Sequence, residues 1–189
     1  ASSYDIVDSA SAIVGATDAI LNTGGVATVT VSGVATAAQG GDIDAFSKDV
    51  VFNVVDDAQD VIDEMTAHSE IASAQSITVS GVANAAQGVT IDGFTKEVVF
   101  DVDSSADALA TAIGGDSTLL DEAGSVTVTG GTVNASDAAA IQGISGYVDG
   151  TASSYDIVDS ASAIVGATDA ILNTGGVATV TVSGVATAA

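Results

Sequence analysis

An internal duplication without a single mismatch constrains this chain more than any other feature. Residues 1–38 recur unchanged as residues 152–189, an offset of 151 positions. A shorter motif returns within this period, because the segment at Tyr4–Ala10 has counterparts starting at Phe52, Phe100 and Tyr155, with spacings of 48, 48 and 55. Repetition at such a period is typical of stacked supersecondary units, each of which buries its apolar face against its neighbours.

The repetition predicts one continuous array over residues 1–189 rather than separate domains. Its sub-repeats fall at about 1–46, 47–94, 95–151 and 152–189. Neither end resembles the polar cap that a stacked array requires. We therefore expect both ends to be cuts in a longer polypeptide of 151-residue units.

Each 48-residue repeat combines two hydrophobic periods. Alternation predicts strands that bury Phe52 and Val54 in one motif and Val29 and Val31 in the other. Spacing of three and four residues predicts a helix after the first strand, with an apolar stripe at Ala10, Ile13, Val14, Ile20 and Leu21. A second, short helix follows the second strand; its expected N-caps are Thr36, Asn84 and Asn134, and its expected ends are Phe46, Phe94 and Ile144.

These elements predict an α/β solenoid. Strand–helix units of about 24 residues, paired into 48-residue repeats, would form a parallel sheet backed by helices, because strands that alternate with helices pair in parallel. A unit of about 24 residues lies within the roughly 20–29 residues of a leucine-rich-repeat coil. The alternative is a larger coil that uses all 48 residues and builds two sheets.

The charge of the chain excludes several classes of partner. Its 25 acidic residues oppose only Lys48 and Lys96, for a net charge of −23. Nucleic acids and anionic membranes both require a basic face, so we expect neither as a partner. No apolar run approaches the roughly 18 residues of a membrane span, and the absence of cysteine excludes disulfides and thiolate chemistry.

Catalytic chemistry has little support in the sequence. His68 is the only histidine and occurs once among repeats that otherwise lack it, so we expect no enzyme. Aspartates at Asp-x-Asp spacing could supply oxygen ligands to calcium, and the candidate ligands are Asp42, Asp44, Asp101 and Asp103. The alternative is that these acids cap helices and solvate the surface. We expect no required cofactor, with calcium as the one candidate ion.

Hydroxyl side chains form a column on the second strand of each repeat. They occupy the outward positions that alternate with the buried valines and isoleucine: Thr28, Thr30, Ser32, Ser76, Thr78, Ser80, Ser125, Thr127 and Thr129. Such a face could bind ice or dock against another sheet, or it could simply be the wet side of a strand, which threonine suits. Interleaved strands that carry Asp5, Asn53 and Asp101 would interrupt the array, which disfavours ice binding.

The pattern aromatic-x-Ile/Val-x-Asp-Ser-Ala, followed by Val-Thr-Val-Ser-Gly-x-Ala-x-Ala-Ala-Gln, resembles repeats of very large acidic surface proteins of Gram-negative bacteria. These include adhesins, surface-layer proteins and haemolysin-like exoproteins. The similarity rests on Tyr4–Ala10, Val29–Gln39, Phe52–Ala58 and Ile77–Gln87. It implies secretion, a cell-surface or matrix location and often calcium. The glycine-rich nonapeptide of calcium-binding RTX repeats is absent, and Gly40-Gly41-Asp42-Ile43-Asp44 is only an echo of it.

Together these features predict a structural repeat protein of an extracellular filament, surface layer or matrix fibre. Its expected partner is itself, through neighbouring units that stack end to end and also associate laterally. The alternative is an adhesin stalk or a ligand-binding array, which would bind calcium or, less readily, ice along its Thr/Ser/Asp face.

Overall fold

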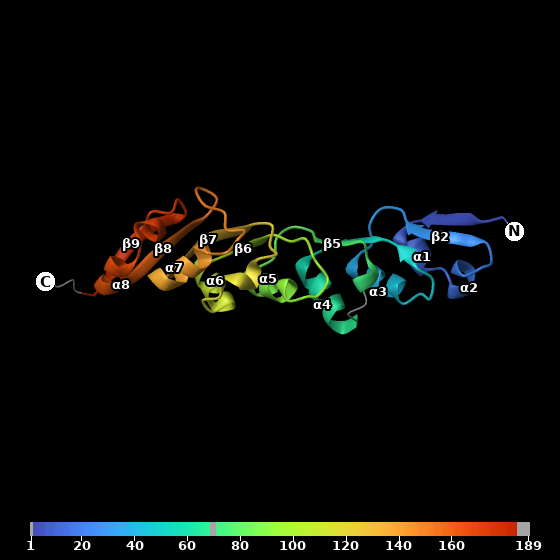
Figure 1. Cartoon of the computed structure of the whole chain (residues 1–189), viewed down its shortest axis with the longest axis horizontal. Helices are drawn as coiled ribbons and strands as arrows, with labels where there is room; N and C mark the ends of the chain where they lie inside the picture. Colours follow the sequence, from blue (N-terminus) through green and yellow to red (C-terminus); the bar gives the residue numbers. More distant parts are fainter. Residues whose placement is uncertain (1, 69–70, 185–189) are drawn as a thin grey trace. The chain divides into compact units, whose positions relative to one another are not determined.

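The computed structural model describes residues 2–68 and 71–184, except for the side chain of His68. The chain is α/β, with parallel strands backed by helices (Figure 1). It divides into two compact units, which are described separately below. Unit 1 comprises Ala1–Gly81 and Phe94–Val99, and unit 2 comprises Val82–Gly93 and Phe100–Ala189.

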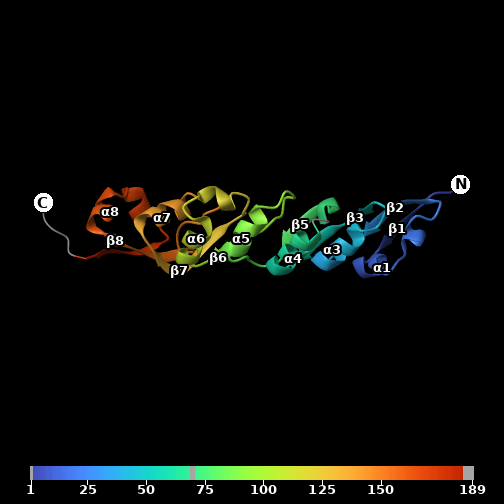
Figure 2. The ribbon, with the colours of Figure 1, turned by 90° about the horizontal axis from the view of Figure 1, so that it is seen from below.

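Unit 1 alternates short strands with short helices (Figure 2). Its strands are β1 (Tyr4–Asp8), β2 (Val26–Val31), β3 (Val50–Val51), β4 (Asn53–Asp56) and β5 (Ser76–Val79). Its helices are α1 (Ala10–Val14), α2 (Asp18–Leu21), α3 (Ala37–Asp44), α4 (Ala58–His68) and the 3-10 turn η1 (Ile71–Ser73).

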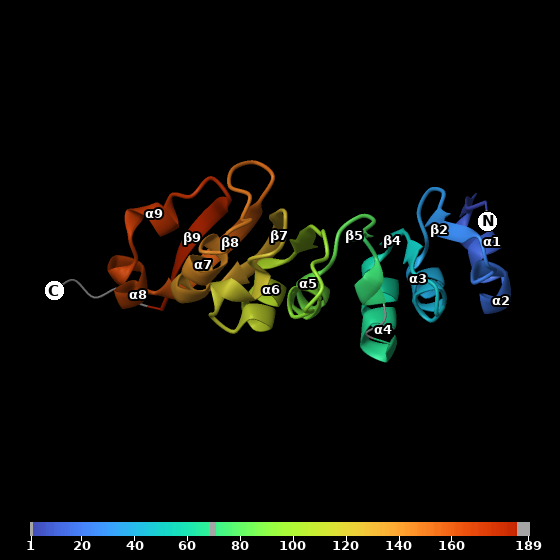
Figure 3. The same cartoon turned by 45° about the vertical axis from the view of Figure 1, so that its right-hand side comes forward.

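Unit 2 follows the same alternation, and its strands β7, β8 and β9 are longer than those of unit 1 (Figure 3). Its strands are β6 (Val102–Ser104), β7 (Val126–Val133), β8 (Ser154–Ser160) and β9 (Val177–Ser183). Its helices are α5 (Ala85–Asp92), α6 (Ala106–Ile113), the 3-10 turn η2 (Ser117–Leu120), α7 (Ala135–Gln142), α8 (Ala161–Gly166) and α9 (Asp169–Leu172).

The strands pair in parallel, as the sequence predicted, but they do not form one sheet. They form three sheets, with the orders β1-β2-β3, β4-β5 and β6-β7-β8-β9. In unit 1 the break falls at Phe52, which separates β3 from β4 and whose carbonyl accepts a hydrogen bond from the amide of Gln75. Beyond this break β4 pairs with β5 over four residues, and the isolated bridge Ala35–Val54 connects the segment after β2 to β4. The first two sheets are thus separated at Phe52, a buried aromatic residue.

The inward faces of the strands are those that the alternation predicted. Val29 and Val31 of β2 are buried, as are Phe52 and Val54 around β4. Phe100 and Val102 occupy the corresponding positions in unit 2 and are also buried. Complete burial of a side chain of this size contributes about 1.5–3 kcal/mol, so these positions account for much of the stability of each unit.

The predicted N-caps of the short helices are confirmed. The side chains of Thr36, Asn84 and Asn134 each accept a hydrogen bond from the backbone amide three residues later. At Thr36 and Asn84 a glutamine completes a capping box. The helices end at Asp44, Asp92 and Gln142, two residues before the predicted ends.

The helix predicted from Ala10 to Leu21 is two helices. α1 ends at Val14, with Gly15 as its C-cap, and α2 begins after Thr17. The break rotates the stripe, so Ile13 and Leu21 are buried whereas Ile20 is more than half exposed. Gly15 lowers helix propensity where the chain turns, and the apolar spacing across it therefore does not continue one helical face.

Candidate functional site

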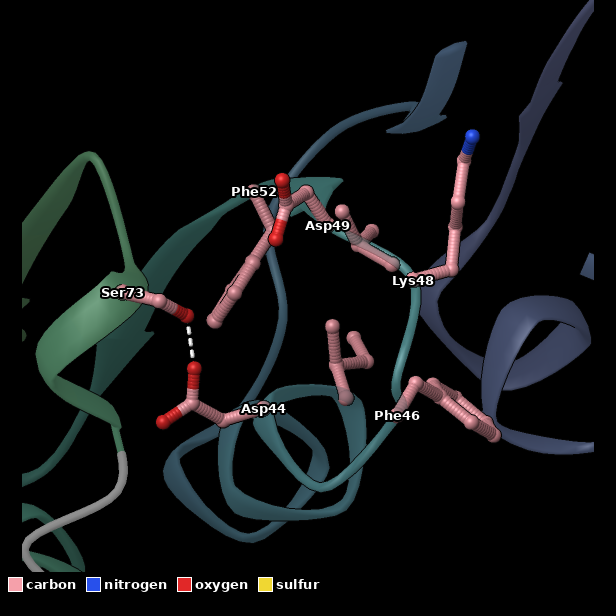
Figure 4. Close-up of a pocket in the computed structure, with 8 residues that line it drawn as sticks. Asp44, Phe46, Lys48, Asp49, Phe52 and Ser73 are labelled. Carbon is pink, nitrogen blue, oxygen red and sulfur yellow. Dashed lines mark hydrogen bonds between the residues drawn. The ribbon is translucent and has the colours of Figure 1, made fainter. Parts of the chain in front are cut away.

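A hollow of about 220 Å³ in unit 1 lies between the end of α3 and the strand β3 (Figure 4). Ser73 donates a hydrogen bond to Asp44 across it, and Asp49 lies at its upper rim in the view. The ammonium group of Lys48 points away from Asp44 and donates to the carbonyl oxygens of Val26 and Ala27, at 3.2 and 3.3 Å. The Asp44–Ser73 hydrogen bond joins the end of α3 to η1.

The tightest acidic cluster of the described residues lies at the start of α4. Asp56, Asp57 and Asp60 each offer a carboxylate oxygen, and these atoms lie within 4.8 Å of one another. Local chain geometry places them there. Asp57 Oδ1 accepts from the amides of Gln59 and Asp60, at 2.9 and 3.0 Å, as a helix N-cap does.

Mutual repulsion is the main electrostatic feature of this cluster. The charge of Asp57, followed by that of Asp56, raises the pKa of the Asp60 carboxyl above its ordinary value. Asp56 is held in place from the other side, since its Oδ2 accepts from the amide of Ala37 at 2.9 Å. A bound cation would relieve the repulsion, but calcium takes six to eight oxygens, so these three side chains would supply only part of a calcium shell.

Removing the charge of Asp57 tests this electrostatic coupling. The Asp57→Asn variant keeps an N-cap oxygen, because asparagine caps as well as aspartate. We expect the pKa of Asp60 to fall toward its ordinary value, because the largest source of repulsion is removed. Carboxyl chemical shifts in an NMR pH titration measure it.

Asp116 supplies the internal control for that titration. Hydrogen bonds from the hydroxyl and the amide of Thr118 lower its pKa, and it lies in unit 2. Its titration should be the same in both proteins. An unchanged pKa at Asp60 in the variant would show that the cluster does not interact as described.

The four candidate calcium ligands occupy different environments. Asp42 is exposed on α3, and Asp44 ends that helix beside Ser73. Asp101 Oδ1 accepts from the Ser125 hydroxyl at 2.7 Å, and Asp103 Oδ1 accepts from the Thr129 hydroxyl at 2.8 Å. Within residues 2–68 and 71–184 these four belong to no group of three acids close enough to share an ion, so calcium binding by them stays a prediction.

Hydroxyls of the Thr/Ser column donate hydrogen bonds to the interleaved strands, which we did not predict from the sequence. Thr28 Oγ1 donates to Asp5 Oδ1 at 2.7 Å, and Ser76 Oγ donates to Asn53 Oδ1 at 2.8 Å. The Ser125–Asp101 bond repeats this arrangement in unit 2. The sequence feature that could have indicated these bonds is the constant spacing of 23 or 24 residues between each acceptor (Asp5, Asn53 or Asp101) and its hydroxyl donor. These hydroxyls connect strands, which further disfavours a free threonine array.

The chain was compared with protein-family models, with curated proteins and with solved structures. No protein-family model, no curated protein and no solved structure matches it. Among the helices of the described residues, none is long and apolar enough to cross a membrane.

Proposed function

We propose that this chain is a structural repeat protein of an extracellular filament, surface layer or matrix fibre, in which tandem 151-residue units stack as a solenoid. The observation that carries this proposal is the burial of the duplicated segment. The same sequence occurs at 2–33 and at 153–184, but the two occurrences bury different sides of it. The second occurrence buries the side that carries Tyr155, and the first buries the side that carries Val29. We take each exposed face as the place where another unit stacks.

One face of the segment is covered only in its second occurrence. Tyr155 is 1% exposed, whereas its counterpart Tyr4 is 50% exposed. Ser153 is buried, and its counterpart Ser2 is exposed. In the second occurrence β7 and α7 precede the segment, and β7 pairs with β8. A preceding unit would cover Tyr4 in the same way.

The opposite face is covered only in the first occurrence. Val29 is 0% exposed and Val31 is buried, whereas their counterparts Val180 and Val182 are 39% and 42% exposed. In the first occurrence β2 pairs with β3, and α3 follows. A following unit would cover Val180 and Val182, so the two exposed faces fit the two ends of a stack.

The charge of the unit governs how stacks would associate sideways. Residues 1–151 carry 22 acids and 2 lysines, a net charge of −20 per unit. Parallel stacks of such units repel one another. We therefore propose that cations lie between neighbouring filaments, with the Asp56–Asp57–Asp60 cluster as one place where they bind. The proposal includes no catalytic step and no required cofactor, and the location outside a bacterial cell depends on the resemblance of the repeats.

A ligand-binding array is the second candidate, and the acidic cluster is the observation that favours it. A cation held by Asp56, Asp57 and Asp60 would make unit 1 a calcium-binding module of an adhesin stalk. The hydrogen-bonded hydroxyls disfavour ice binding. Saturable calcium uptake that is lost in Asp57→Asn would favour this candidate over a purely structural role.

Cryo-electron microscopy of the native material, with helical reconstruction, tests the proposed function. We expect a fibre whose axial repeat contains one 151-residue unit. If cations hold neighbouring fibres together, a calcium chelator at low ionic strength should separate the bundles and leave each fibre intact. Isolated globular particles in place of fibres would contradict the structural role.

A further inference from the structure

The surface where β7 and α7 meet the second occurrence of the duplicated segment is here called the junction. It is held by hydrogen bonds as well as by apolar contact. Gln142, at the end of α7, donates to the hydroxyl of Tyr155 at 2.7 Å and to the carbonyl oxygen of Ile171 at 3.0 Å. Its own side-chain oxygen accepts from Thr174 Oγ1 at 3.0 Å. One glutamine thus contacts three groups of the duplicated segment.

Two aspartates, one on each side of the junction, each accept a hydrogen bond from a backbone amide on the other side. Asp159 Oδ2 accepts from the amide of Ala135 at 3.1 Å, at the start of α7. Asp149 Oδ1 accepts from the amide of Gly176 at 3.1 Å. These bonds fix the register of the segment against β7 and α7. A segment with another sequence or another register would leave several of these groups without partners, which is costly where they are desolvated.

All the groups that the junction recognises on the segment are present a second time in the chain. Tyr4, Asp8, Ile20, Thr23 and Gly25 are the counterparts of Tyr155, Asp159, Ile171, Thr174 and Gly176. The Tyr4 side chain, at 50% exposed, lacks the cover that Tyr155 has. The identical segment in unit 2 thus indicates which surface fits this face.

We propose that the face of residues 2–33 that carries Tyr4, here called the docking face, binds the surface formed by β7, α7 and Asp149 in a second copy of this chain. There it takes the place of that copy's own residues 153–183. This inference rests on the proposed structural role, because it supplies the contact by which separate chains continue a stack. The docking face and the surface it binds differ, so the contact is head-to-tail and can propagate into a filament.

Competition with the covalently attached segment sets the conditions for this exchange. A tethered segment acts at an effective concentration of about 1 mM, so the unmodified chain keeps its own segment in place at micromolar concentrations. If only the binding of the internal segment is weakened, the docking face of another copy should bind in its place. The duplication allows this to be done with the same substitution at either of two positions.

The Tyr155→Ala variant weakens the internal segment and leaves the docking face intact. Loss of a buried aromatic side chain should lower the concentration at which exchange is half complete by about a hundredfold or more. We expect concentration-dependent oligomers in sedimentation velocity, and we expect monomers for Tyr4→Ala and for the double variant. Association that persists without Tyr4 would indicate another binding mode and overturn the proposal. Asp159→Ala removes the acceptor of the Ala135 amide and, with Asp8→Ala as its control, provides the same comparison without the loss of an aromatic side chain.

Cysteine pairs identify the partners directly, because the chain has no cysteine of its own. Thr132 and Asp156 are partners in the β7–β8 ladder, and Asp5 is the counterpart of Asp156. Thr132→Cys with Asp156→Cys should close a disulfide within one chain, since adjacent strand partners lie within disulfide reach. Thr132→Cys with Asp5→Cys, in the Tyr155→Ala background, should give disulfide-linked dimers and longer chains on a non-reducing gel.

The two pairs separate failure of this inference from failure of the proposed function. If the 132–156 pair closes but the 5–132 pair links no chains, exchange between copies is wrong and the stacking of consecutive units stands. If the 132–156 pair does not close, the junction itself is wrong, and the proposed stacking fails with it.

Discussion

Replacing Leu21 by alanine is expected to lower the free energy of unfolding by about 2–5 kcal/mol, the range for a fully buried leucine. Leu21 is 1% exposed in α2. Its counterpart Leu172 in α9 has identical neighbours along the sequence but is partly exposed. Leu172→Ala should therefore cost distinctly less, because helix propensity and the unfolded chain are locally the same and only the packing differs.

Urea denaturation followed by far-UV circular dichroism measures both leucine variants. Local sequence effects cancel within the pair, so a difference in midpoint reports on what covers the segment in each place. Equal destabilisation would contradict the assignment of opposite buried faces to the two occurrences. The pair is therefore also a check on the observation that carries the proposed function.

The Gly88→Ala variant is expected to be destabilised, although alanine normally stabilises a helix interior by about 0.5–1 kcal/mol relative to glycine. Gly88 lies inside α5, where an added Cβ would be 2.7 Å from Val102 Cγ2 and 2.9 Å from Leu120 Cδ2. Both neighbours are buried. Overpacking of this kind costs about 1–3 kcal/mol, so steric conflict exceeds the gain in helix propensity.

Gly166→Ala is the matched control for Gly88→Ala. Gly166 ends α8, and an added Cβ there would meet no heavy atom within 4 Å. This variant should be as stable as the unmodified chain or slightly more so, measured by the same urea denaturation. If both variants behaved alike, the close approach of α5 to the strands would be contradicted.

Local patterns predicted the elements of this chain well. Thr36, Asn84 and Asn134 were predicted as caps because their hydrogen bonds are made within four residues, and each caps its helix. The buried faces of the strands at Val29 and Phe52 likewise follow from alternation, which depends only on the pleat of a strand.

Features that depend on long-range pairing were predicted less well. The division between the first two sheets falls at Phe52, and alternation alone does not specify it. The cluster of Asp56, Asp57 and Asp60 was not predicted, because it does not have Asp-x-Asp spacing and forms where the end of β4 meets the first turn of α4. The junction at Gln142 was also missed, since its partners lie 13 to 32 residues away.

The bonds from Thr28 to Asp5 and from Ser125 to Asp101 have a consequence for the environments in which the protein can stay folded. In each, a carboxylate is stabilised by a neutral hydroxyl rather than by a lysine. Ion pairs between exposed groups weaken as salt screens them, but a hydroxyl carries no net charge to be screened. These two inter-strand bonds are therefore expected to persist at salt concentrations that weaken ion pairs between exposed groups.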